Sequence, residues 1–94
     1  MNPNQAIHDL TLALLYLNRF VESPADFWTS TEFRAWKGYD FEALNHLNDE
    51  GLIEDKHRNK SLWITEEGVA EAKRILEQLG IEDWKPEESA SQAK

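Results

Sequence analysis

Residues 44–68, LNHLNDEGLIEDKHRNKSLWITEEG, decide the fold of this 94-residue chain. The stretch opens with two leucines three residues apart, and Gly51 follows at a position typical of a helix end. Two short apolar runs, residues 52–53 and 62–64, enclose a polar segment rich in Lys, Arg, His and Asn, a pattern that predicts a β-hairpin with a long loop. Thr65 then precedes two glutamates, which is typical of a capped helix start. The stretch therefore predicts a helix, a hairpin and a closing helix.

The two helices that flank the hairpin have clear limits. Asp40 is a suitable N-cap for a helix over residues 41–50, because its side-chain oxygen can accept from a free backbone N–H of the first turn. The buried seam of that helix should comprise Phe41, Leu44 and Leu47. Gly80 followed by Ile81 predicts a Schellman stop for the closing helix. The apolar face of the closing helix should comprise Val69, Ala72, Ile75, Leu76 and Leu79.

A longer helix is predicted before this region, over residues 4–21, with Asn2 or Asn4 as its cap. Its helical rhythm gives one apolar stripe, expected to be buried: Ile7, Leu10, Leu14, Leu17 and Val21. Leu12 and Leu15 do not fit that stripe. Either another segment of the same chain covers them, or they form a subunit contact. We predict a homodimer built on this helix, with Leu12 and Leu15 near its seam.

The segment between the long helix and Asp40 is rich in aromatic residues. A capping box at residues 29–32 predicts a short second helix that carries Phe33 and Trp36 and ends at Gly38. Phe33, Trp36 and Phe41 are expected in the core. The set around this helix is larger than a short helix usually hides: Phe27, Trp28, Phe33, Trp36, Tyr39 and Phe41.

Composition limits the classes of protein that fit. The chain has no cysteine, which excludes a disulfide framework and a thiolate zinc site. The longest apolar run, residues 12–17, is too short to cross a bilayer, and residues 1–5 lack the basic charge of a secretory signal. We expect a soluble, cytoplasmic protein that does not bind membranes. Residues 1–84 should form one domain, with Trp84 docked on the body and residues 85–94 as a polar tail.

The order of elements resembles that of a winged helix, a mainly α fold with one β-hairpin and a helix-turn-helix. The stretch from Leu44 to Gly68 looks like the end of a recognition helix, a wing and the start of a closing helix in small bacterial regulators. A narrower resemblance covers most of residues 5–80. RAWKGYD at residues 34–40, with TEEG at residues 65–68, is similar to a family of short bacterial proteins catalogued as a domain of unknown function. That resemblance implies the fold and no activity.

DNA binding is the function that a winged helix suggests first. The predicted wing carries Lys56, Arg58 and Lys60 for phosphates, and three polar residues of the third helix could read bases: Asn45, His46 and Asn48. That helix is nevertheless acidic, because residues 40–50 hold four carboxylates and no Lys or Arg. The whole chain also has a net charge of −8, which opposes binding to a polyanion. A DNA-binding transcriptional regulator is therefore the alternative hypothesis.

A protein-interaction or regulatory module is the preferred hypothesis. Trp28 and Tyr39 are candidates for an exposed binding surface, and Arg34 and Lys37 flank them and could pair with acidic groups of an unidentified protein partner. No phosphate loop, HExxH or GxSxG motif occurs, and the serines and histidines are not grouped. Glu42, His46 and Glu50 share one helix face, which is better explained as a solvated acidic face than as a metal site. We expect no enzyme activity, no metal and no cofactor.

Overall fold

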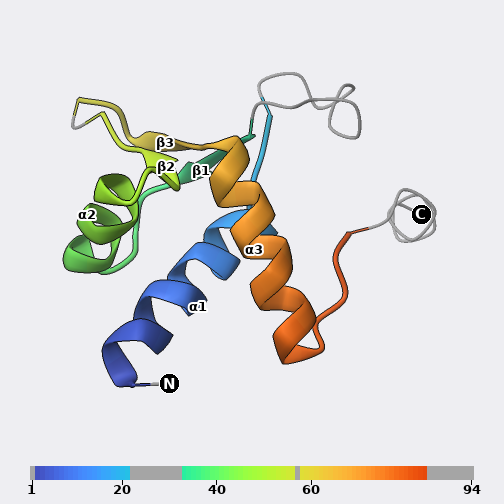
Figure 1. Cartoon of the computed structure of the whole chain (residues 1–94). Coiled ribbons are helices and arrows are strands. Elements are labelled where there is room, and N and C mark those ends of the chain that lie inside the picture. The colour runs from blue at the N-terminus through green and yellow to red at the C-terminus, as the bar shows by residue number, and fades with distance from the viewer. Residues whose placement is uncertain (1, 22–32, 57, 85–94) are drawn as a thin grey trace.

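The computed structural model in Figure 1 describes residues 2–21, 33–56 and 58–84. Within these residues, three helices and a small antiparallel sheet form a mainly helical α+β fold, compatible with a winged-helix-like fold as predicted. The elements in chain order are α1 (Pro3–Leu17), β1 (Phe33–Trp36), α2 (Phe41–Asp49), β2 (Ile53–Glu54), β3 (Ser61–Ile64) and α3 (Glu66–Leu79).

The sheet has the order β1-β3-β2, so that β3 lies in the centre. β3 pairs with β1 from Phe33–Ile64 to Trp36–Ser61, and with β2 at Ile53–Ile64. The predicted hairpin is confirmed, and β1 adds the third strand that an isolated hairpin needs for stability. Figure 1 shows the sheet at one end of the molecule, with α2 beside the hairpin and with α1 and α3 extending away from the sheet.

The prediction of a short second helix through Phe33 and Trp36 is wrong, because these residues form β1. Successive residues of the strand face opposite sides of the sheet, so Ala35 is buried and Trp36 is exposed, while Phe33 and Arg34 are both half-buried. Pairing with β3 satisfies backbone groups along all four residues, whereas a one-turn helix would leave most of its N–H groups without partners. No helix directly precedes α2 among the described residues, so the first helix of a helix-turn-helix is not seen there.

Helix α1 begins where predicted and ends early. Asn2 Oδ1 accepts a hydrogen bond from the Gln5 amide at 2.8 Å, which confirms Asn2 as the N-cap. The helix stops at Leu17 because the chain then runs beside β1. Phe20 and Arg34 exchange backbone hydrogen bonds of 2.8 and 2.9 Å.

The predicted caps of α2 and α3 are confirmed. Asp40 Oδ2 accepts from the Ala43 amide at 3.0 Å, and the Thr65 hydroxyl accepts from the Gly68 amide at 3.0 Å. Gly80 has a φ of 70°, and the Ile81 amide donates to the Leu76 carbonyl at 2.9 Å, as in a Schellman stop. Gly68 also lies so close to the hairpin that a Cβ would collide with the backbone of Leu52.

The core contains side chains from all six elements. Helix α1 faces this core with the side that was predicted to lie outside it. Leu12 and Leu15 are 1% and 0% exposed, so they cannot form a dimer seam, and that prediction is wrong. The alternative, that other segments of the same chain cover them, is confirmed, because α2, α3 and β1 pack against α1. The first three residues of the predicted buried stripe, Ile7, Leu10 and Leu14, are 46–48% exposed, whereas Leu17 is half-buried and Val21 is buried as predicted.

Three further core predictions are wrong. Trp36 and Phe41 are exposed, because Trp36 lies on the outer face of the sheet and Phe41 starts α2. Leu79 is exposed in the last turn of α3. Phe33 is half-buried and packs against the core.

Several predicted features lie outside the described residues, namely Phe27, Trp28, the capping box at residues 29–32 and the tail at residues 85–94. Among the described residues, no helix is long and apolar enough to cross a membrane.

Candidate functional site

The most unusual surface of the described residues is the outer face of α1, formed by Pro3, Ile7, Leu10 and Leu14. These four residues recur at intervals of four, three and four, so they lie in one row along the helix. All four are exposed. The single formally charged residue of α1 is Asp9, which is buried and accepts a 2.8 Å hydrogen bond from the Gln5 side chain. The outer face of α1 is therefore apolar and carries no charge.

Helix α1 is apolar on two sides, which is rare for a helix on a protein surface. An ordinary surface helix has one apolar stripe and a charged opposite face, whereas a helix that is apolar all round is normally covered all round. Leu12, Leu15 and Tyr16 account for the inner side, which contacts the core. The outer side consists of apolar side chains, as a buried surface does, yet Ile7, Leu10 and Leu14 are exposed to solvent. An exposed row of apolar side chains is typical of an interaction site.

The residues predicted to read bases are held against the protein. The His46 ring stacks on the His8 ring of α1 with 3.9 Å between ring centroids, and His46 Nε2 lies 2.9 Å from a Glu50 carboxylate oxygen. Asn48 Oδ1 accepts from the Asp55 amide at 3.1 Å, which fixes the start of the hairpin loop. Asn45 is half-buried. Two of the three predicted base-reading side chains thus have structural partners.

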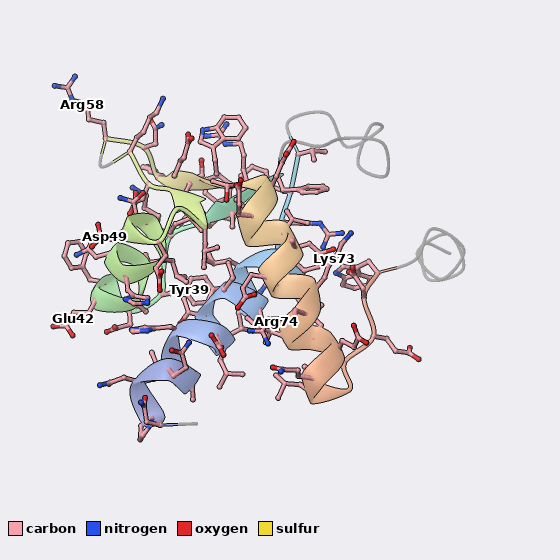
Figure 2. The ribbon with its side chains drawn as sticks, in the orientation of Figure 1. Tyr39, Glu42, Asp49, Arg58, Lys73 and Arg74 are labelled. Atoms are coloured by element: carbon pink, nitrogen blue, oxygen red, sulfur yellow. The ribbon has the colours of Figure 1, made fainter. Side chains whose placement is uncertain are left out.

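The predicted basic wing is exposed at the hairpin loop, where Lys56, Arg58 and Lys60 are all open to solvent. Figure 2 shows Arg58 at the tip of the hairpin, with Glu42 and Asp49 projecting outward from α2 on the same side of the molecule. The acidic side chains of α2 therefore lie on the same side of the molecule as the basic wing. A DNA phosphate that approached the wing would also come near these carboxylates, which would repel it.

The predicted protein-binding cations have partners within the chain. Lys37 forms an ion pair with Asp55 and donates to the Lys56 carbonyl at 3.0 Å. Arg34 donates to the Ser61 hydroxyl, and its guanidinium lies 4.6 Å from the centre of the Trp63 ring.

Tyr39, the other described member of that predicted patch, is half-buried, and its hydroxyl accepts from the Asn18 side chain at 3.3 Å. Trp36, which was expected in the core, is an exposed aromatic residue of this region and stacks on Phe20 with 4.8 Å between centroids. The alternation of residues 33–36, read as a strand, would have identified it.

The segment after α3 is fastened to the end of α1. The Tyr16 hydroxyl donates to Asp83 Oδ2 at 2.5 Å, and Arg19 lies 3.7 Å from the other oxygen of that carboxylate. The indole of Trp84 donates to the Leu17 carbonyl at 3.0 Å, so the predicted docking of Trp84 is confirmed. Burial, together with the hydrogen bond to Asp83, raises the pKa of Tyr16 above its usual value.

No group of three or more His, Asp or Glu side chains is placed to hold a metal ion in the part of the chain that the structure describes. The carboxylates that face solvent are arranged as helix-end and surface charges instead. Glu71, for example, pairs with Arg74 one turn along α3, and this hydrogen-bonded pair lowers the pKa of Glu71.

Comparison with known proteins identifies the family. The family model described as Domain of unknown function (DUF6429) matches residues 3–82. An uncharacterized protein, y4hR, of Sinorhizobium fredii (strain NBRC 101917 / NGR234) is 34% identical over 74 residues, which are 78% of this chain and 86% of that protein. No solved structure matches the chain. The chain belongs to the DUF6429 family, and the predicted resemblance to a family catalogued as a domain of unknown function is confirmed.

Proposed function

We propose that this protein is a non-enzymatic protein-interaction module, and that the outer face of α1 is its binding surface. The observation that carries this proposal is the exposure of Ile7, Leu10 and Leu14 in one row without a charged side chain among them. The predicted cytoplasmic location remains part of this proposal.

The energetics of this face favour binding over free exposure. Complete burial of one Leu or Ile side chain contributes roughly 1.5–3 kcal/mol, so covering the exposed half of each contributes about 1 kcal/mol. Three such side chains together contribute roughly 3 kcal/mol. Because the row contains no charge, covering it requires no desolvation of an ionic group.

Site-specific photo-cross-linking tests the proposal. A benzophenone amino acid replaces Leu10 on the outer face of α1, or Glu77 on the exposed side of α3 as the matched control. We expect irradiated cells to give a discrete cross-linked protein adduct from position 10 and none from position 77. An absence of adducts at position 10, in a chain that folds normally, would contradict the proposal.

A DNA-binding regulator is a second candidate, favoured by the exposed basic wing of Lys56, Arg58 and Lys60. The test is titration of a random duplex at several salt concentrations, with the native chain and with all three residues changed to Glu. Loss of three phosphate contacts should flatten the log–log salt slope by about three. Lys73→Glu on α3 is the control and should leave the slope unchanged. Failure of the native chain to bind at low salt would exclude this candidate.

A further inference from the structure

We infer that the outer face of α1 binds a second copy of this chain, with the two α1 helices antiparallel about a two-fold axis between Ile7 and Leu10. This inference rests on the proposed function and names its partner. It replaces the predicted seam at Leu12 and Leu15, which are buried in the core.

The spacing of the row matches itself when it is reversed. Pro3, Ile7, Leu10 and Leu14 recur at intervals of four, three and four, which read the same in both directions. That repeat is the heptad pattern by which one helix packs against another.

The midpoint of this row lies between Ile7 and Leu10, with Pro3 and Leu14 at its two ends. In an antiparallel pair, Ile7 of one copy meets Leu10 of the other, and Pro3 of each copy lies beside Leu14 of the other. A two-fold contact requires such a self-complementary surface.

Charge selects the same face for contact between two copies. Each chain carries a net charge of −8, so two copies repel each other over most of their surfaces. Exposed carboxylates lie on the other helices, for example Glu42 and Asp49 on α2 and Glu77 on α3. Helix α1 has one carboxylate, Asp9, and it is buried. A basic partner would gain nothing from this uncharged row, whereas an acidic copy avoids repulsion there.

Sedimentation velocity on the full chain tests the inference directly. We expect the native chain to shift from the 10.9 kDa monomer toward twice that mass between about 1 and 500 µM, because the row is short and implies a Kd in the micromolar range. Leu10→Glu should be monomeric throughout. The matched control is Leu79→Glu, since Leu79 is 51% exposed but lies on α3, and this variant should still dimerise. Circular dichroism checks that both variants fold.

Disulfide trapping gives a second readout. Because the chain has no cysteine, Leu10→Cys places one thiol per copy beside the proposed axis. Mild oxidation should give a covalent dimer faster than it does with Leu79→Cys. A native chain that stays monomeric at about 500 µM, or a Leu10→Glu chain that dimerises like the native one, would overturn the inference. Adducts at position 10 that contain only other proteins would also overturn it while leaving the proposed function standing, and a lack of any adduct would reject both.

Discussion

The two sides of α1 have almost the same chemistry and opposite environments. Leu12 and Leu15 on the inner side are buried, while Leu10 and Leu14 on the outer side are about half exposed. The same residue type thus alternates between core and surface within one helix of 15 residues. The difference shows that side-chain polarity does not choose the core face of such a helix.

The surrounding elements choose it instead. Helices α2 and α3 and strand β1 all contact α1, and together they close over its inner side. Tyr16 adds a polar anchor there, because its hydroxyl binds Asp83 of the segment after α3. The outer side has no such anchor among the described residues, and it is the side that we propose to bind another protein.

The strongest test of the contrast between the two sides of α1 compares the stability of the Leu15→Ala variant with that of the Leu14→Ala variant. We expect Leu15→Ala to lower the free energy of unfolding by about 2–5 kcal/mol, because it opens a cavity in a closed core. Leu14→Ala should cost less than about 1 kcal/mol, because its side chain is already half in water. Urea denaturation at low protein concentration measures both. Equal losses for the two variants would mean that the two sides of α1 are equally covered.

Removing the polar anchor of the inner side should have a smaller effect. Asp83→Ala deletes the acceptor of the Tyr16 hydroxyl and removes a carboxylate that lies 3.7 Å from Arg19. We expect a loss of about 1–3 kcal/mol in the free energy of unfolding, as for other hydrogen bonds to a charged group. Glu82→Ala, one residue away, is the control and should lie within about 0.5 kcal/mol of the native chain. Thermal denaturation of the native chain, Asp83→Ala and Glu82→Ala measures these differences in stability.

The same anchor predicts a pH dependence above neutrality. Because the pKa of Tyr16 is raised in the folded protein, the unfolded chain loses this proton first, near pH 10. The stabilisation is therefore complete below about pH 10 and is lost as the pH rises further, at about 1.4 kcal/mol per pH unit for this group. Tyr16→Phe should show a shallower alkaline decline than the native chain when urea midpoints are compared between about pH 9 and 11. Parallel declines would exclude Tyr16 as the source.

The smallest effect is expected from a polar substitution on the outer side. Leu10→Gln should change the unfolding free energy of the dilute monomer by no more than about 0.5 kcal/mol, as is usual at the surface. Leu12→Gln on the inner side is the matched comparison, and it should unfold the chain or destabilise it severely, because it buries an unpaired amide. Circular dichroism of both variants provides the measurement. A severe loss with Leu10→Gln would show that other residues of the chain cover this face.

The elements that depend on neighbours in sequence could be predicted well. Asn2, Asp40 and Thr65 cap the three helices, and Gly80 ends the last one, because a cap needs only a side chain and the backbone within one turn. The hairpin was predictable in the same way from its two apolar runs. The strand at residues 33–36 was not, since its partner, β3, lies about thirty residues away in the chain.

The candidate site depended still more on tertiary structure. The row of Ile7, Leu10 and Leu14 was recognised from its spacing, but it was assigned to the core because an apolar stripe usually faces inward. His46 and Asn48 were candidates for base contacts. Only the tertiary structure shows that His46 stacks on His8 and that Asn48 accepts a hydrogen bond from the Asp55 amide.

The amino-acid sequence by itself determined where the three helices begin, where α3 ends, the position of the hairpin, and the acidic charge that opposes DNA. These properties arise from local backbone chemistry or from a sum over residues, so no knowledge of distant contacts is needed. Only the tertiary structure decided which side of α1 is buried, since both sides are apolar and the choice depends on where α2, α3 and the sheet pack.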